Sequence, residues 1–525
     1  MSNSATIPGS RPVAAVGAFC ESPSGSAASP MEAGLAAFRA QDFPSAAVKF
    51  TMATGALASK GAAAYAWLAR ADLHLHHVEE AESAARKALE LDPNLAAAQS
   101  ALAEVYFRQA KFGDADAIVK KLVQAGTSDA RAYLTLAEIY WATANNRAAK
   151  SNMDAAHQLD QDDPDISFAW AETLPPQERL QEYKKLLAAG NFEDEREKES
   201  LKVETALLED QQQQPSPGCK LTAKTLPMET KLETLAIDAK TLRGFGLNVK
   251  VNDTPSKLLI DTGSTGILIN SKIAEKAGVI RIADSHIGGL GDRGPSPGYV
   301  GFARRLQVGA LIFENCHIGV VDKKDSLGED GLIGTDVFED FFVDLDFPNY
   351  KLRLSELPPY PGAGASAPAL QVHASAKDTS HNLWIPPQFS SYERVYRFGH
   401  FLLIPGQIND SPPKLFLLDT GAWDNFISPG AAKGYVKVHR DEESIVKGLS
   451  GRINKVYFTG DVKLTFGHFQ QKRYDLAALD LTDVSNDVGT ELSATLGFRM
   501  LYLLEMKIDY RDQLVDFSYD PNRFH

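Results

Sequence analysis

Two short stretches of the chain place an aspartate, a threonine and a glycine directly after an apolar run. The first is KLLIDTGSTGILIN, residues 257–270, and the second is KLFLLDTGAWDNFI, residues 414–427. A carboxylate at the end of a buried strand is held in a tight loop, where a glycine lets backbone N–H groups approach it. Two such carboxylates in contact share one proton, which provides one base and one acid. Asp261 and Asp419 are therefore the candidate catalytic pair.

The sequence around each stretch is duplicated as well. VNDTPSKLLIDTGS, from Val251, matches INDSPPKLFLLDTGA with one inserted residue. Each copy continues into a glycine-rich segment, GGLGD in the first and KGLSGR in the second. DGLIGTDVFEDFFVDLDFPNYKLRL then matches SATLGFRMLYLLEMKIDYRDQLVDF, and each predicts a glycine, a short helix and a strand. The region after Lys220 therefore holds two copies of one β unit, and each copy supplies half of one site.

This order of segments resembles the aspartic peptidases of the retropepsin and pepsin-like clan, including bacterial aspartyl protease family proteins. In that family two Asp-Thr/Ser-Gly loops meet across a pseudo-twofold axis. The resemblance covers about residues 240–520 and implies an all-β bilobal acid-protease fold with aspartic-type endopeptidase activity. It implies that the ionised aspartate activates a water molecule while the protonated one hydrogen-bonds the scissile carbonyl. Such a site uses no metal and no cofactor.

The resemblance also assigns supporting roles to residues of the two loops. The threonines are expected to exchange hydrogen bonds across the pair, and the glycines to present their amides to the carboxylates. Ser264 is expected to bond the outer oxygen of Asp261, whereas Ala422 cannot do this for Asp419, which predicts an asymmetric dyad. The segments 332–334 and 495–497 are expected to pack behind the loops. The dyad-support residues are Thr262, Gly263, Ser264, Thr420, Gly421 and Ala422.

The glycine-rich segments are candidates for flaps that close over a substrate. Pepsin-like enzymes carry a tyrosine in the first flap, but HIGGLGDRGPSPGYV has none at its tip, and Tyr299 comes later. Glycine-rich tips in both copies resemble the retroviral type, here fused into one chain. Trp423 and Asp424 are subsite candidates, with simple packing as the alternative. The flap candidates are Gly288, Gly289, Leu290 and Gly291 in the first copy and Gly448, Leu449, Ser450 and Gly451 in the second.

The N-terminal part of the chain carries a repeat of a different kind. WLARADLHL, ALAEVYFRQ and TLAEIYWAT recur at a spacing of 34 residues, with Ala69, Ala103 and Ala137 in register. This resembles tetratricopeptide repeats, an all-α solenoid of helix pairs. The function implied is docking of a protein partner or a substrate, and the alternative is a helical spacer.

The chain thus predicts a multidomain protein in which helical repeats precede a bilobal β region. The predicted parts are a disordered leader (1–30), tetratricopeptide-like repeats (31–160), a helical extension and linker (161–218), peptidase lobe 1 (219–356), an interlobe linker (357–390) and peptidase lobe 2 (391–525).

Bulk properties restrict the partners and the compartment. A net charge of −14 argues against nucleic acid as the main partner, and no apolar run is long enough to span a membrane. The three cysteines are too few for a disulfide framework and are predicted to be free thiols. Without a clear signal peptide the default compartment is the cytoplasm, with export open if the N-terminus is incomplete.

Two other functions are compatible with parts of the sequence. A non-catalytic adaptor would bind partners through the repeats and hold peptides in an inactive cleft, but both aspartates are present. Glycoside hydrolysis also uses two carboxylates, yet these should lie too close together for it. The peptidase is the leading hypothesis, and the adaptor is the alternative. Cleavage preference and the natural substrate lie beyond what the sequence predicts.

Overall fold

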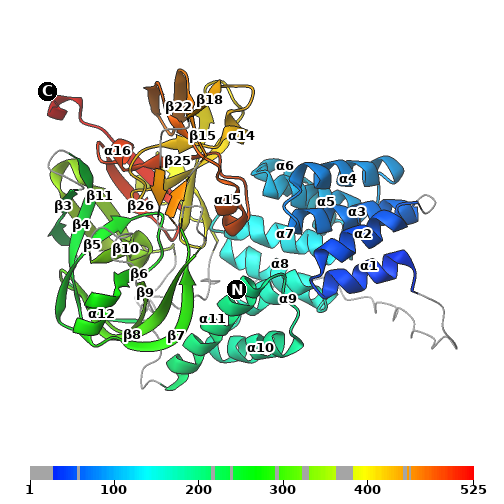
Figure 1. The fold of residues 1–525 in the computed structure, drawn as a ribbon, viewed down its shortest axis with the longest axis horizontal. Coiled ribbons are helices and arrows are strands. Elements are labelled where there is room, and N and C mark those ends of the chain that lie inside the picture. The colour runs from blue at the N-terminus through cyan, green and yellow to red at the C-terminus, as the bar shows by residue number, and fades with distance from the viewer. Residues whose placement is uncertain are drawn as a thin grey trace, which may run out of the picture.

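Helices form the N-terminal part of the chain and strands form the rest (Figure 1). The structure is a computed structural model. It describes residues 28–55, 59–213, 219–236, 241–289, 295–321, 330–361, 382–441, 446–448, 451–453 and 455–524.

The helices of residues 30–213 pack as successive antiparallel pairs. Alanines at the pair crossings, among them Ala69, Ala103 and Ala137, have no exposed surface, which lets the backbones approach closely. Ser29 begins α1 with a capping box, and Asp163 caps α9. The predicted helical repeats are therefore confirmed. The bounds are α1 Pro30–Arg39, α2 Phe43–Ala53, α3 Ser59–His74, α4 Val78–Leu91, α5 Ala96–Arg108, α6 Phe112–Gln124, α7 Ala130–Trp141, α8 Asn146–Leu159, α9 Pro164–Ala171, α10 Pro176–Ala189 and α11 Glu195–Gln213.

A buried chain of ion pairs links the successive repeats. Arg70 donates from Nε to Glu104 at 2.8 Å, and Glu104 accepts a second bond from Arg131 at 3.0 Å. Arg131 in turn donates from Nε to Asp163 at 2.8 Å. Because each buried charge has a partner on the next helix pair, loss of one partner would leave an uncompensated charge. This network fixes how the repeats stack.

The first lobe is a sheet in the order β1-β9-β6-β10-β5-β4-β8-β7, with β3 paired to β4. The predicted hairpin turn joins β4 to β5, where Asn252 and Asp253 have φ of 44° and 68°. The bounds are β1 Lys220–Ala223, β3 Glu233–Ala236, β4 Leu242–Val251, β5 Thr254–Asp261, β6 Ile267–Asn270, α12 Ser271–Ala277, β7 Ile280–Ile287, β8 Ser296–Val308, β9 Leu311–Val321 and β10 Gly331–Gly334.

The second lobe repeats this arrangement around β16 and β25, in the order β18-β21-β24-β17-β25-β16-β15-β22-β23, with β14 paired to β15. A separate hairpin, β19–β20, accompanies it. The bounds are β14 Tyr396–Phe398, β15 Phe401–Ile408, β16 Lys414–Asp419, β17 Phe426–Ile427, α14 Pro429–Ala432, β18 Val438–Asp441, β19 Val446–Gly448, β20 Gly451–Ile453, β21 Val456–Thr459, β22 Val462–Phe466, β23 Phe469–Arg473, β24 Ala477–Ala478, α15 Thr482–Val488, β25 Ala494–Gly497 and α16 Phe498–Leu501.

A third sheet joins the lobes, in the order β13-β27-β26-β11-β12-β2. Its central pair, β11 with β26, takes one strand from each copy, with Val343 opposite Ile508. The two copies are thereby fixed relative to each other. The bounds are β2 Met228–Lys231, η1 Thr335–Phe338, β11 Phe341–Asp346, η2 Phe347–Asn349, β12 Lys351–Glu356, η3 Pro387–Phe389, β13 Glu393–Arg394, β26 Glu505–Asp509, β27 Leu514–Ser518 and η4 Pro521–Phe524.

The helical region packs against both lobes, but in different ways. Phe107 and Phe112 of the repeats share one apolar cluster with lobe 2, where the Phe112 ring lies 4.6 Å from that of Tyr396. In contrast, α11 lies against β7 of lobe 1, beside which Figure 1 draws it. Polar contacts secure α11, since Glu199 bonds His286 at 2.9 Å and Asp210 bonds His317 at 2.8 Å.

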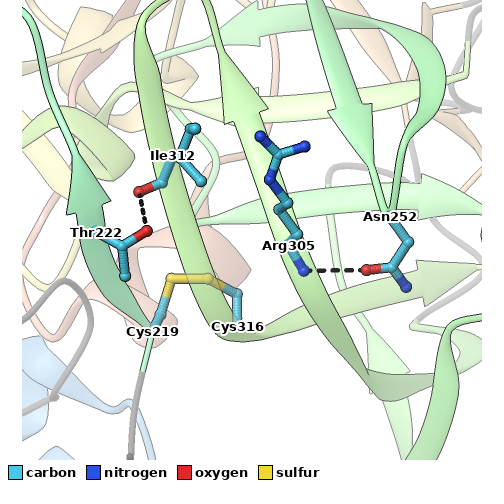
Figure 2. Close-up of a disulfide and its surroundings, with 6 residues drawn as sticks. All are labelled: Cys219, Thr222, Asn252, Arg305, Ile312 and Cys316. Carbon is cyan, nitrogen blue, oxygen red and sulfur yellow. Dashed lines mark hydrogen bonds between the residues drawn. A yellow bond between two sulfur atoms is a disulfide. The ribbon is translucent and has the colours of Figure 1, made fainter.

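The free-thiol prediction is wrong for two of the three cysteines. Cys219 and Cys316 form a disulfide between residues 97 apart in the chain (Figure 2). The cause is the pairing of β1 with β9, which sets Lys220 opposite Glu314 and brings the two cysteines together. Cys20 lies outside the described residues.

Candidate active site

The two Asp-Thr-Gly loops stand at the ends of matching strands. Asp261 ends β5 and lies opposite Gly334 of the parallel strand β10. Asp419 ends β16 and lies opposite Gly497 of the parallel strand β25. Each apolar-apolar-glycine segment therefore pairs with the strand that carries a carboxylate, as the duplicated pattern predicts. Gly331 and Gly334 admit no side chain here, because an added Cβ would lie 2.0 Å and 2.4 Å from neighbouring backbone oxygens.

The threonines brace the two loops across the pseudo-twofold axis. The Thr262 amide donates to Thr420 Oγ1 at 3.1 Å, and the Thr420 amide donates to Thr262 Oγ1 at 3.0 Å. Each hydroxyl then donates to a carbonyl of the opposite strand, Thr262 to Leu418 at 2.8 Å and Thr420 to Ile260 at 2.9 Å. All four groups are buried, so this network holds the loops in one geometry.

Each glycine of the loops faces the carboxylate of the other lobe. A Cβ on Gly421 would lie 2.3 Å from Asp261 Cγ, and one on Gly263 would lie 2.7 Å from Asp419 Cγ. Backbone amides hold the carboxylates, because the Gly263 N–H donates to Asp261 and the Ala422 N–H donates to Asp419, both at 2.9 Å. The two side chains also hydrogen-bond each other. Two carboxyl groups are thus held in direct contact.

Burial and mutual repulsion control how the pair ionises. Burial, followed by the charge of Asp419, raises the pKa of Asp261 to about 8. Burial also raises the pKa of Asp419, against hydrogen bonds that favour its ionised form. The positive charge of Arg243 lowers the pKa of both carboxyl groups. The pair therefore retains one proton into the neutral range and titrates as a unit.

The asymmetry of the dyad does not come from Ser264. Among the described residues the Ser264 hydroxyl makes no hydrogen bond to Asp261. Only its backbone N–H lies near that residue, 3.3 Å from the carbonyl oxygen. The lobes differ instead in the third loop residue beyond the glycine. Gly266 donates to Asp336 at 2.9 Å in lobe 1, whereas Asp424 occupies the matching position in lobe 2.

Hairpins occur at both places where flaps were expected. Gly288 and Gly289 follow β7, which pairs with β8, and Gly448 lies opposite Gly451 in the β19–β20 hairpin. The four other flap candidates, Leu290, Gly291, Leu449 and Ser450, lie outside the described residues.

The two subsite candidates differ in what they contact. Trp423 is 41% exposed, donates from Nε1 to the Leu242 carbonyl at 2.9 Å and lies under the Arg499 guanidinium at 4.9 Å. The Asp424 carboxylate accepts bonds from Arg473 and Arg499 at 3.0–3.1 Å. Asp424 is therefore committed to two arginines, whereas the Trp423 ring offers surface beside the loop.

Two residues beside the loops were missed in the sequence. Arg243 donates from Nη1 to the Gly421 carbonyl at 2.8 Å, and the His400 side chain hydrogen-bonds the backbone of Gly263. Each reaches from its own lobe to the loop of the other. A signal existed, because the two residues lie at matching places in the copies, with Arg243 eight residues before Val251 and His400 eight residues before Ile408.

No grouping of three or more histidine, cysteine, aspartate or glutamate side chains suited to a metal ion occurs in the part of the chain that the structure describes. Within the same residues no helix combines the length and apolar character needed to cross a membrane.

The β region of the chain matches a protein family, and the chain is similar to a solved structure. Residues 247–337, which include Asp261 and Gly334, match the family model described as aspartyl protease. A similar solved structure is that of TTC0263, a thermophilic TPR protein in Thermus thermophilus. It is 22% identical over 34% of this chain and 96% of that chain, with a TM-score of 0.27. No curated protein matches the chain. The chain thus combines a helical N-terminal part with a β region in which residues 247–337 match the aspartyl protease model.

Proposed function

We propose that the protein is an aspartic endopeptidase that cleaves peptide bonds with a water molecule activated by Asp261 and Asp419. The observation that carries this proposal is the direct contact of two buried carboxyl groups in loops that brace each other. A shared proton in such a pair supplies the base and the acid that amide hydrolysis requires.

The arrangement supports a sequence of proton transfers in which no covalent bond forms between the enzyme and the substrate. The ionised carboxylate takes a proton from water, whose oxygen attacks the scissile carbonyl carbon. The protonated partner gives its proton to the carbonyl oxygen, so that a neutral diol forms. The carboxylate that received the water proton then donates it to the leaving nitrogen, the C–N bond breaks, and the other carboxyl group takes a proton back from the diol. The dyad ends with one proton, as it began.

The pH range of cleavage follows from the same proton. Cleavage requires one ionised and one protonated carboxyl group, so it is expected to fall above about pH 8, where Asp261 loses its proton. It is also expected to fall in acid, once the second carboxyl group is protonated.

The test compares the wild-type protein with Asp261→Asn and Asp419→Asn on a diverse peptide mixture from about pH 3.5 to 7.5, with products identified by mass spectrometry. Each substitution is expected to reduce cleavage by roughly 10³-fold or more, since neither carboxyl group can act alone. Asp253→Asn is the matched control, because Asp253 lies in the exposed β4–β5 turn and pairs with Arg305. Cleavage that persists in both dyad variants would refute the proposal.

We further propose that the repeats dock a substrate or a protein partner. The surface available for this purpose excludes the part of the repeats around Phe107 and Phe112, which lobe 2 covers. In the adaptor alternative the repeats still dock a partner, but the site of Asp261 and Asp419 cleaves no peptide bond. Two results together would favour the adaptor: the wild-type protein cleaves no peptide, and the Asp261→Asn variant binds peptides as tightly as the wild type does.

A further inference from the structure

Arg243 is a half-buried cation that bridges the two lobes beside the dyad. It is the second residue of β4 in lobe 1, and among the described residues its guanidinium hydrogen-bonds only the carbonyl of Gly421 in lobe 2. Gly421 is the glycine that faces Asp261 directly. The guanidinium therefore lies against the lobe 2 loop. This loop carries Asp419, and its glycine contacts Asp261.

His400 occupies the pseudo-symmetric position in lobe 2. In lobe 1, Gly246 of β4 pairs with Leu259, two residues before Asp261. In lobe 2, Leu403 of β15 pairs with Leu417, two residues before Asp419. Arg243 and His400 each precede these paired residues by three positions. Each side chain reaches the active-loop glycine of the opposite lobe, so the two contacts form a matched pair.

The two members of the pair differ in charge. Burial lowers the pKa of His400, which leaves its imidazole neutral in the range where the dyad ionises. The other charges that His400 faces are those of Asp336 and Arg397. Arg243 stays positive throughout, because a guanidinium does not lose its proton in this range. Lobe 1 thus supplies a permanent positive charge where lobe 2 supplies a neutral donor.

Nothing else in the described chain neutralises Arg243. No carboxylate of the described residues lies within ion-pair distance of its guanidinium, although partly buried arginines are normally paired. Among the main causes of the pKa shifts of the dyad, the charged groups are the two carboxyl groups themselves and Arg243. Asp424, the nearest carboxylate along the lobe 2 loop, is already bound by Arg473 and Arg499. The negative charge that balances Arg243 is therefore that of the ionised dyad.

We propose that Arg243 is a positioning residue of the candidate active site. Its hydrogen bond ties the Gly421 loop to lobe 1, and its fixed charge stabilises the singly ionised dyad. His400 makes the contact related by the pseudo-twofold axis, but without a charge. This deepens the proposed function, on which it rests for its meaning in catalysis. Substitution of Arg243 by a neutral residue should make the dyad hold its protons to higher pH, by about one pH unit for a nearby charge.

The effect is measurable without turnover. A buried dyad that keeps a proton in the folded state, and loses it in the unfolded state near pH 4, makes the protein less stable as pH rises. The loss ends once the folded dyad has ionised, near pH 8 for Asp261. Without Arg243 the folded dyad ionises later, so the loss continues further. The melting temperature of Arg243→Gln should therefore fall increasingly below that of the wild type as pH rises through the ionisations of the dyad.

The experiment measures melting temperatures of the full chain from about pH 5 to 10 for the wild type, Arg243→Gln, Arg243→Lys and Arg305→Gln. Arg305→Gln is the matched control, because it removes the same charge from the same lobe, on β8, where Asp253 of the β4–β5 turn is its partner. Each variant is also made in a background with both dyad aspartates changed to asparagine. Only Arg243→Gln is expected to show a melting temperature that falls increasingly below that of the wild type as pH rises. In Arg243→Lys this widening gap should be much smaller, and in the background with both asparagines it should vanish.

Three outcomes would overturn the proposal: a gap that is the same at every pH, a gap that persists without the dyad, or an equal gap for Arg305→Gln. If Arg243→Gln does not fold, His400→Arg is the second variant. A second cation should lower the pH at which the dyad ionises and reduce the loss of stability between about pH 6 and 9. An unchanged loss would count against the proposal.

Peptide cleavage by the same proteins separates this proposal from the function. A wild type that cleaves no peptide but shows the widening gap would contradict the peptidase and leave the role of Arg243 intact. Cleavage whose pH profile is the same in wild type and Arg243→Gln would contradict the role of Arg243 and leave the peptidase intact.

Discussion

The two lobes carry nearly identical Asp-Thr-Gly loops on differently supported scaffolds. The cross-lobe bonds of Thr262 and Thr420 agree within 0.1 Å, at 3.1 and 3.0 Å from the amides and 2.8 and 2.9 Å from the hydroxyls. Away from the loops the lobes diverge. Lobe 1 is closed by a disulfide and touched by α11 through polar side chains, whereas lobe 2 merges its apolar core with the repeats. Shared chemistry restrains the loops, while the outer surfaces have been free to differ.

Outside the two aspartates themselves, the largest expected effect on cleavage comes from adding a methyl group at the contact between the loops. In Gly421→Ala the new Cβ would lie 2.3 Å from Asp261 Cγ, and in Gly263→Ala it would lie 2.7 Å from Asp419 Cγ. Displacement of a catalytic group by a fraction of an ångström is expected to reduce kcat/KM by roughly 10²-fold or more. Gly421→Ala should be the more severe. Equal activity of either variant and the wild type would show that the contact is not required.

The second prediction concerns the shared core. Phe112 is buried against Tyr396 of lobe 2, and Phe112→Ala is expected to lower the free energy of unfolding by about 3–5 kcal/mol. Phe38→Ala is the matched control, because Phe38 is equally buried but lies in the first repeat. Hydrogen exchange should increase in β15 and β16 for Phe112→Ala and not for Phe38→Ala. Unchanged exchange in lobe 2 would mean that the repeats and the lobe are energetically separate.

The third prediction concerns lobe 1, which contains the disulfide and does not share the apolar cluster of Phe112. Replacement of Cys219 and Cys316 by serine is expected to lower the free energy of unfolding by about 2–4 kcal/mol, because the bond closes a long loop in the unfolded chain. Chemical denaturation with and without reductant measures it. Reduced wild type and the double variant should behave alike. A disulfide of this kind persists in oxidising compartments, which argues against the cytoplasm as the default.

Features carried by a local pattern could be predicted from the sequence. Residues close together in the chain define the Asp-Thr-Gly loops, the strands behind them and the helix pairs. Each of these patterns also occurs more than once in the sequence, which strengthens the prediction. Gly334 and Gly497 were found in this way, and both lie opposite a dyad aspartate.

Features that depend on pairing between distant segments could not be predicted. Cys219 meets Cys316 only because β1 adds to the edge of the sheet beside β9. Phe107 and Phe112 fit the repeat pattern, and nothing local shows that they pack against lobe 2. Arg243 and His400 act on the opposite lobe, so their role follows from the strand register and the twofold arrangement rather than from a motif. Ser264 was expected to bond Asp261 through its side chain, and among the described residues only its backbone N–H bonds that residue.

The fourth prediction tests whether the two halves of the brace are equal. Thr262→Val and Thr420→Val each remove the hydroxyl that accepts from one buried amide and donates to one carbonyl. Each is expected to lower the free energy of unfolding by about 1–3 kcal/mol, the range for leaving a buried polar group unsatisfied. The two values should agree, and the double variant should lose less than their sum. Strongly unequal values would show that one lobe dominates the brace.

The smallest expected effect is at the contact of α11 with lobe 1. Glu199 and His286 are about half exposed, so Glu199→Gln should change the free energy of unfolding by about 0.5 kcal/mol or less. Asp210 and His317 are more buried, with side chains 16% and 13% exposed, so Asp210→Asn should have the larger effect. If Asp210→Asn instead destabilised the protein as much as Phe112→Ala, α11 would be as integral to lobe 1 as the repeats are to lobe 2. The two lobes would then differ in whether the helical region is attached by polar or by apolar contacts, and not in how much these contacts contribute to stability.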